Sequence, residues 1–197
     1  MLQAWRRTRK YFLAAAGIFF FGSIGGALVP LFSRALAADA AKAVEKTLGP
    51  LAREVYAAGL AGRIILIWRH NLNASFLVFV AGAIPVLPML AVFANGIPFG
   101  LLGVYWHLSG RLPIHQFVLG VLPHGLLELP AIFLAAALSW RLSLGFWGWL
   151  WHRKPSGVLV QAAADVIPLG FMVICLLGAA AVCEVLVSPM FLPIRGS

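Results

Sequence analysis

Long stretches without Asp, Glu, Lys or Arg limit what this chain can fold into. Tyr11–Ser33 and His70–Gly110 carry no charged residue, and the second is long enough for two membrane crossings. Leu112–Trp140 holds one acidic residue, and Pro155–Ile194 holds two. An α-helix rises ~1.5 Å per residue, so about 20 residues span the ~30 Å hydrocarbon core of a bilayer. The four stretches therefore predict about five transmembrane helices.

The composition favours a membrane protein over the other fold classes. Of the 197 residues, 62% are hydrophobic and 11% are charged, and the mean hydropathy is +0.95. A soluble domain of this length needs more charge to cover its surface. A transmembrane barrel needs strands that alternate apolar and polar residues, and these stretches do not alternate. We therefore predict an all-α, polytopic transmembrane helical bundle with an extramembrane amphipathic segment.

Basic residues precede the first apolar stretch and predict its orientation. Arg6, Arg7, Arg9 and Lys10 stand before a stretch that is too long for a typical signal-peptide core, so we predict an uncleaved signal-anchor. Lys and Arg beside a span favour the cytoplasmic side. We predict a multi-pass plasma-membrane protein with a cytoplasmic N-terminus. Membrane topology then explains the net charge of +9, and no nucleic-acid partner is predicted.

The segment 34–70 is Ala-rich and mixed in charge, unlike the rest of the chain. Its apolar residues repeat at helical spacing, and Gly49-Pro50 interrupts the repeat, so we predict two amphipathic helices near the membrane face. They are either a binding platform for a partner or a solvated cover for the bundle. The predicted segments are a basic N-terminus at 1–10, a first span at 11–33, the amphipathic extramembrane helices at 34–70, a four-span membrane core at 71–189 and a C-terminal tail at 190–197.

Turn-forming residues predict the limits of the spans inside the membrane core. Asn95–Pro98 has the composition of a turn, so it separates a second span from a short third one, for which a re-entrant or broken helix is the alternative. Trp140–Ser156 sets aromatic rings beside cations and is typical of an interfacial segment. The predicted spans are Asn71–Ala94, Ile97–Leu108, Ile114–Ser139 interrupted by Pro123 and Pro130, and much of Val158–Val187.

Glycines of the first span have the spacing of a helix-packing motif. Gly22 and Gly26 fit the GxxxG pattern, in which small residues let another helix approach closely. The alternative is that glycine is simply frequent in membrane helices.

Ionisable residues inside the predicted spans are the candidates for function. Glu128 lies near the centre of its apolar stretch, where a charged group costs at least ~2.5 kcal/mol. His124 shares its helix face, and Glu184 is a second carboxyl in the last span. We predict that one intramembrane polar cluster forms where spans two, four and five meet. Its residues are Asn71, Asn73, Asn95, Gly96, Gly100, Pro123, His124, Gly125, Glu128, Pro130 and Glu184.

Three interpretations of this cluster stay open. Its polar side chains either hydrogen-bond across helices and hold the bundle together, or form a proton- or cation-linked transport site, or bind a metal through His124, Glu128 and Glu184. The chain has no HExxH motif, no Gly-rich phosphate loop, no CxxC pair and no GxSxG elbow. We therefore predict no enzyme, no catalytic residues, no cofactor and no metal.

Two motifs in the membrane core carry a resemblance to a known family. Asn95–Gly100 reads N-G-x-x-x-G, and Pro123–Ala131 reads P-H-G-x-x-E-x-P-A. Glu184 is followed shortly by Pro189, and two asparagines stand at the start of the second predicted span. In these features the chain resembles the stage II sporulation protein M family, over roughly 71–189.

The resemblance implies a membrane scaffold. The namesake of the family anchors peptidoglycan-degrading enzymes in the membrane between two cells during spore formation. Such enzymes, or other envelope proteins, are therefore the expected partners besides the lipid bilayer, and 34–70 is the expected binding segment. The alternative function is a small transporter or permease subunit that uses Glu128 and Glu184. A homodimer is a further hypothesis, because a bundle this small shields two carboxyl groups better with a partner.

Overall fold

The computed structural model describes residues 1–188, apart from the side chain of His124. The described part contains helices and no strands, which confirms the predicted fold class. Pro189 and the predicted tail at 190–197 lie outside the described residues. The helices are α1 (Leu2–Phe32), α2 (Arg34–Ala57), α3 (Leu60–Val80), the short 3-10 helix η1 (Ala81–Ala83), α4 (Leu87–Leu108), α5 (Ile114–Leu150) and α6 (Ser156–Leu186).

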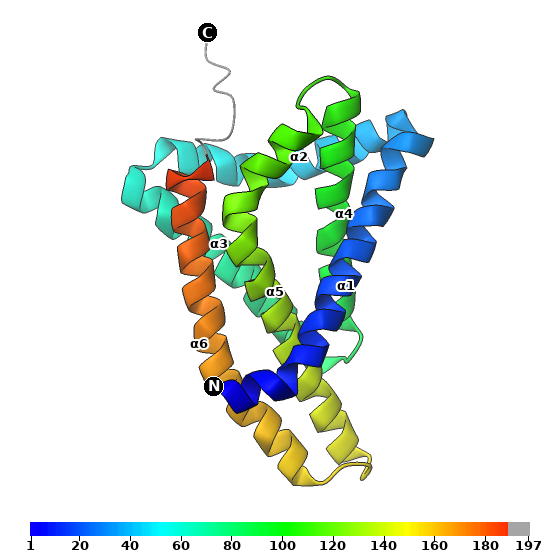
Figure 1. The fold of residues 1–197 in the computed structure, drawn as a ribbon, viewed down its shortest axis with the longest axis vertical. Helices are drawn as coiled ribbons and strands as arrows, with labels where there is room; N and C mark the ends of the chain where they lie inside the picture. Colours follow the sequence, from blue (N-terminus) through cyan, green and yellow to red (C-terminus); the bar gives the residue numbers. More distant parts are fainter. Residues whose placement is uncertain (189–197) are drawn as a thin grey trace.

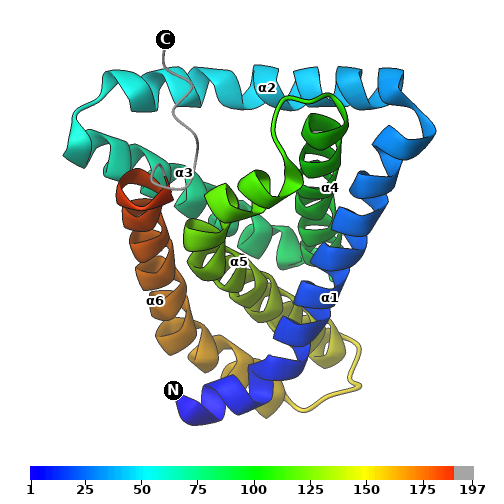
Figure 2. The same cartoon turned by 45° about the horizontal axis from the view of Figure 1, so that its top comes forward.

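Five helices are long and apolar enough to cross a membrane, as the apolar stretches predict. They form a bundle in which α1 runs beside α4 and α5 runs beside α6 (Figure 1). The remaining helix, α2, lies across one end of this bundle, opposite the end at which the chain begins (Figure 2). The candidate spans are Leu2–Phe32, Leu60–Ala83, Leu87–Leu108, Gly125–Leu150 and Ser156–Leu186.

The GxxxG glycines of α1 lie in backbone contact with α4. A Cβ atom added to Gly22 would overlap the carbonyl oxygen of Phe93, and one added to Gly26 would overlap that of Ile97. Only a residue without a side chain fits such an approach. The prediction that Gly22 and Gly26 pack against another helix is therefore confirmed.

The facing glycines of α4 have the same role. A Cβ atom on Gly96 would overlap the carbonyl oxygen of Phe19, and one on Gly100 would overlap that of Ser23. Each helix thus presents small residues one turn apart to the backbone of the other. We call the contact formed by Gly22, Gly26, Gly96 and Gly100 the glycine seam. It brings α1 and α4 closer than side-chain packing would allow.

The turn predicted at Asn95–Pro98 is wrong, because α4 passes through it without a break. The second span is instead Leu60–Ala83, and the chain turns just after it, with Pro88 in the first turn of α4. A proline costs little there, since the first N–H groups of a helix have no partner within the helix. Inside the membrane an unpaired backbone group costs several kcal/mol, so a continuous helix is favoured over a turn at Asn95-Gly96.

The two amphipathic helices predicted within 34–70 are wrong as well. One helix, α2, runs through Gly49-Pro50, and the following residues already belong to α3. The side chain of Arg63 marks the boundary, since its guanidinium donates to the carbonyl of Ala58 at 3.0 Å and to that of Tyr56 at 3.2 Å. A cation at this position satisfies the free carbonyl groups at the end of α2.

Helix α5 is longer than the predicted fourth span and contains both of its prolines. It runs through Pro123 and Pro130 and continues past Ser139 to Leu150, so most of the predicted interfacial segment is helical. Figure 1 shows that its first turns run in a different direction from the rest. A proline inside a helix removes one hydrogen bond and bends the axis, which explains the bend.

The end of α3 and the short η1 that follows it are joined to α5 by hydrogen bonds to backbone carbonyl groups. The hydroxyl of Ser139 donates to the carbonyl of Phe79 at 2.6 Å, and the indole of Trp147 donates to that of Ala83 at 3.0 Å. These bonds satisfy backbone acceptors at the point where the helix stops, as a membrane interior requires.

The glycine seam predicts a loss of stability on adding a single methyl group. Gly96→Ala or Gly100→Ala must push α1 and α4 apart, and we expect each to lower the free energy of unfolding by roughly 1–3 kcal/mol. The control is Gly25→Ala in α1, where a Cβ atom meets nothing within 4 Å. Thermal unfolding in detergent micelles measures the effect. Equal melting temperatures for Gly96→Ala and Gly25→Ala would contradict the seam.

Candidate functional site

The two membrane glutamates lie on neighbouring helices near the end of the bundle that α2 crosses. Glu128 stands close to the start of the span Gly125–Leu150, and Glu184 stands close to the end of α6. Both side chains are half-buried, and their carboxyl groups are close enough for their charges to interact. The candidate span differs from the predicted Ile114–Ser139, because it begins at Gly125 and α5 continues to Leu150.

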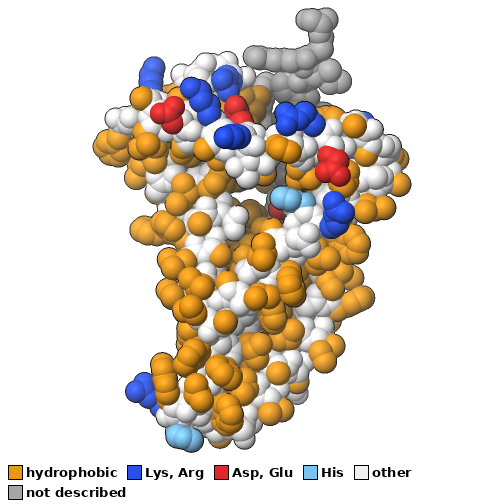
Figure 3. Space-filling model, turned by 180° about the vertical axis from the view of Figure 1, so that it is seen from behind, with side chains coloured by type: hydrophobic (Ala, Val, Ile, Leu, Met, Phe, Trp, Pro, Cys, Tyr) orange, Lys and Arg blue, Asp and Glu red, His pale blue; other side chains and the backbone are white. Residues whose placement is uncertain are grey.

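A glutamate near the end of a span costs less than one at the bilayer centre, because water and headgroups are within reach. Figure 3 shows a recess below the charged layer of the molecule, with a histidine at its mouth and an acidic side chain inside it.

The other predicted cluster residues are divided among different contacts. Asn95 is exposed, and its amide donates to the carbonyl of Ala91 in its own helix at 3.0 Å. Gly96 and Gly100 belong to the glycine seam. The remaining members of the predicted cluster lie on α3 (Asn71, half-buried, and Asn73, exposed) and on α5 (Pro123, Gly125, Pro130 and His124, whose side chain lies outside the described structure).

The structure therefore brings Glu128 and Glu184 together but gives several other members separate surroundings. Among the described residues, no group of three or more His, Cys, Asp or Glu side chains is arranged to hold a metal ion. The role of the two glutamates stays a prediction.

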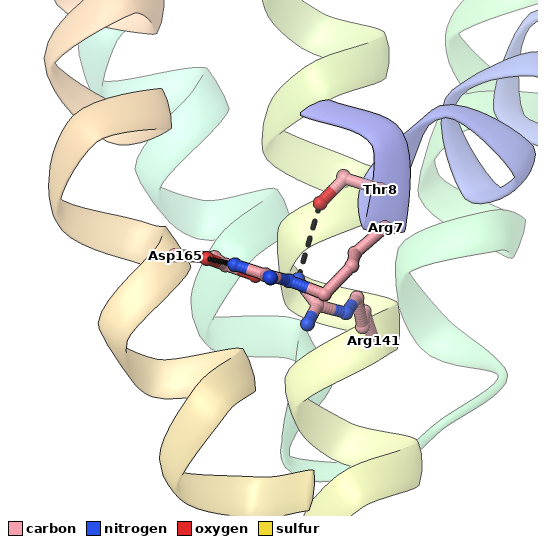
Figure 4. Close-up of polar contacts among 4 residues, drawn as sticks. All are labelled: Arg7, Thr8, Arg141 and Asp165. Atoms are coloured by element: carbon pink, nitrogen blue, oxygen red, sulfur yellow. Dashed lines mark hydrogen bonds and ion pairs between the residues drawn. The ribbon is translucent and has the colours of Figure 1, made fainter. Parts of the chain in front are cut away.

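A second polar site, at the opposite end of the bundle, was not anticipated from the sequence. Asp165 of α6 accepts two hydrogen bonds from the guanidinium of Arg7, at 2.8 and 2.6 Å. Asp165 also accepts a hydrogen bond from the guanidinium of Arg141 of α5 at 2.5 Å. The same guanidinium donates to the hydroxyl of Thr8 at 3.2 Å. Figure 4 shows these four side chains meeting between α1, α5 and α6. We call them the arginine clamp.

The arginine clamp ties the start of α1 to the α5–α6 pair. The side chain of Asp165 is 5% exposed and that of Arg141 10%, whereas Arg7 is 32% exposed. One carboxylate faces two guanidinium groups, so the cluster keeps an excess positive charge. Forked, bidentate contacts such as that of Arg7 are the strong form of this interaction. The sequence held a signal for it, because a carboxylate inside an apolar span needs a cation, but the partner is 158 residues away.

Removing the carboxylate of the arginine clamp should destabilise the bundle. Asp165→Asn leaves two guanidinium groups close together without their counter-charge. We expect a loss of roughly 1–3 kcal/mol, between the values for exposed and fully buried pairs, because the clamp lies near the end of the bundle. The control is Asp39→Asn, which removes an exposed contact of 3.9 Å with Lys42. Thermal unfolding compares the two, and an unchanged melting temperature for Asp165→Asn would contradict a structural role.

Glu128 should tolerate the loss of its charge. Glu128→Gln keeps hydrogen-bonding capacity and removes repulsion with Glu184, so we expect a folded protein that is at least as stable as the original. Size-exclusion chromatography and thermal unfolding in detergent measure this, with Glu54→Gln on exposed α2 as the control. A variant that aggregates while the control does not would show that the bundle needs a carboxylate at this position.

The comparisons with known proteins give one match. A family described as Stage II sporulation protein M matches residues 12–189, which is most of the chain and includes all but the first turns of α1. No curated protein and no solved structure matches. The match covers the glycine seam, the glutamate pair and two members of the arginine clamp, Arg141 and Asp165. The chain thus belongs to the stage II sporulation protein M family.

Proposed function

We propose that this protein is a membrane scaffold on which α2 forms the binding platform for envelope proteins that remodel peptidoglycan. The observation that carries the proposal is the placement of α2. Its 24 residues lie across one end of the bundle, and only Ala37 and Ala41 are buried. A helix that exposes most of its residues contributes little to the core, so its length needs another explanation.

The platform is fixed in place by contacts at its ends and middle. Ser33 caps its first turn by accepting from the backbone N–H of Leu36 at 3.2 Å, and Arg63 caps its last turn. In between, Arg111 of the α4–α5 loop pairs with Glu45 at 3.1 Å. A surface held in this way is ordered before a partner binds, which lowers the entropic cost of association.

The exposed surface of α2 has the chemistry of a protein-binding surface. Charges of both signs are spread along it (Figure 3). Apolar side chains stand among them, with Tyr56 77% exposed and Leu36 59% exposed. Tyrosine is enriched at binding interfaces because it combines a large apolar ring with a polar tip. Mixed charges favour specific partners over a uniformly anionic surface such as a membrane.

Orientation is part of the proposal. The end at which the chain starts carries Arg6, Arg7, Arg9 and Lys10, and the α5–α6 loop adds Arg153 and Lys154. Basic residues gathered beside spans favour the cytoplasmic face. The α2 platform then faces outward, toward peptidoglycan.

The scaffold proposal predicts that partners are lost when the platform surface is changed. Lys46→Glu, Arg53→Glu and Tyr56→Ser alter exposed side chains of α2 without touching the buried Ala37 or Ala41. Pull-down from cross-linked membranes of the source organism, read by mass spectrometry, should lose peptidoglycan-degrading enzymes in this triple variant. Retained capture of the same enzymes by the triple variant would contradict the platform.

The matched control changes charges at the other end of the bundle. Arg153→Glu with Lys154→Glu alters two exposed residues of the α5–α6 loop, far from α2, and should capture the same enzymes as the unchanged protein. Equal losses in both variants would show that capture follows the net charge and not the platform.

Orientation is tested by labelling of single cysteines in intact cells. In a background with Cys175→Ala and Cys183→Ala, a membrane-impermeant maleimide should label Glu54→Cys on α2. It should label Arg153→Cys in the α5–α6 loop only after permeabilisation. The reverse pattern would overturn the assigned orientation.

A further inference from the structure

Basic side chains line a cavity at the end of the bundle opposite α2. The cavity measures about 440 Å³ and opens between the start of α1, the middle of α5 and the first turns of α6. No acidic side chain lines it. The cations that line it are Arg6, Arg7, Arg9, Lys10 and Arg141.

Most of this positive charge has no acidic partner. The one carboxylate nearby, that of Asp165, is shared between Arg7 and Arg141. Arg6 and Arg9 form no ion pair with any described residue, and the ammonium of Lys10 lies 5.0 Å from the centre of the Tyr11 ring. Five cations therefore face one anion, so the cavity attracts a negatively charged ligand. Arginine forks match the geometry of phosphate oxygens.

The depth of the cavity in the bilayer indicates which kind of phosphate it meets. The uncharged stretch of α1 begins at Tyr11, directly after Lys10. The ring of Tyr11, which lines the cavity, contacts the ring of Trp140 with centroids 5.5 Å apart, directly beside Lys10 and Arg141. Tryptophan beside cations marks the level of lipid headgroups. The cavity therefore opens where phospholipid phosphates lie.

A second cavity, between α1 and α6, gives room for a lipid chain. It measures about 480 Å³, has only apolar lining and is bounded by Trp5 of α1 and by Leu169 and Met172 of α6. Gln161 of α6 lines the basic cavity, and Leu169 follows it by eight residues on the same helix. Leu169 therefore lies ~12 Å further into the bundle than Gln161. A free phosphate ion has no apolar part that could fill such a groove, whereas a phospholipid has acyl chains.

From the basic cavity, its depth and the apolar groove we infer that this end of the bundle binds an anionic phospholipid. The phosphate headgroup lies against Arg6, Arg9 and Lys10, and an acyl chain lies along Trp5 and Leu169. The arginine clamp holds Arg7 and Arg141 in position behind the headgroup. Basic pockets between membrane helices are a known form of lipid site. The inference concerns the end of the bundle away from α2 and is independent of the scaffold proposal.

Native mass spectrometry of the full chain in detergent tests the lipid site. The probes are phosphatidylglycerol, phosphatidylcholine and inorganic phosphate. We expect retained adducts of phosphatidylglycerol, few of phosphatidylcholine and none of inorganic phosphate. The triple variant Arg6→Gln, Arg9→Gln, Lys10→Gln should bind phosphatidylglycerol about a hundredfold more weakly, since each basic residue near an anionic lipid contributes roughly fivefold.

The matched control removes the same charge from α2. It carries three changes on α2, which are Arg34→Gln, Lys46→Gln and Arg53→Gln. The three residues are exposed and lie at the other end of the bundle, so phosphatidylglycerol adducts should persist. All three residues changed in the test variant are exposed too, and an unchanged melting temperature without lipid verifies its fold.

Three results would overturn the inference. Equally weak phosphatidylglycerol binding to both triple variants would show that binding follows the net charge of the protein. Undiminished binding to the test variant would place the lipid elsewhere. Retained inorganic phosphate that displaces phosphatidylglycerol would assign the cavity to a free anion.

Discussion

Backbone contact between α1 and α4 is the packing interaction on which the arrangement of the bundle depends. In a bilayer, burial of apolar surface does not drive helices together, because lipid tails are as apolar as side chains. Close approach must supply the attraction through dispersion contacts, and glycine permits the closest approach. The glycine seam fixes the upper part of α1 against α4. The arginine clamp fixes its beginning against α5 and α6. One helix thus joins the two halves of the molecule.

The two polar sites meet the cost of the membrane in different ways. Asp165 is compensated by two guanidinium groups and lies at the end where basic residues gather. Glu128 and Glu184 have each other as their charged neighbours and lie toward the end covered by α2. Ionic groups at opposite ends give the bundle a clear polarity. In our proposals the basic end meets lipid headgroups and the α2 end meets protein partners.

The sequence predicted the class of the fold and the number of spans, because uncharged stretches of sufficient length have few other uses. It misplaced the limits of the spans where turn-forming residues occur inside helices. Asn95–Pro98 and Gly49-Pro50 have the composition of turns in water. At Asn95–Pro98 a turn would leave backbone groups unpaired inside the membrane, which costs too much free energy. At Gly49-Pro50 the helix α2, of 24 residues, continues through the single proline.

The candidate sites could be predicted only in part, because their partner residues lie on other helices. GxxxG spacing showed that Gly22 and Gly26 could pack a helix, but the choice of α4 as partner is made by the tertiary structure. Asp165 signalled a need for a cation, while its partners come from α1 and α5. The grouping of Asn95 with Glu128 assumed that polar side chains gather, yet Asn95 bonds to its own helix. Pairing across helices is a long-range property, and one sequence lacks that information.

Through the glycine seam and the arginine clamp, α1 holds the bundle together from both of its ends. Expression of 1–33 and 34–197 as two separate chains in one membrane, with an affinity tag on the first, tests it most directly. We expect the tagged helix to co-purify with the remainder in detergent, because the glycine seam and the arginine clamp need no covalent link. A remainder that stays folded and monodisperse without co-purifying with the tagged helix would show that the bundle does not depend on α1.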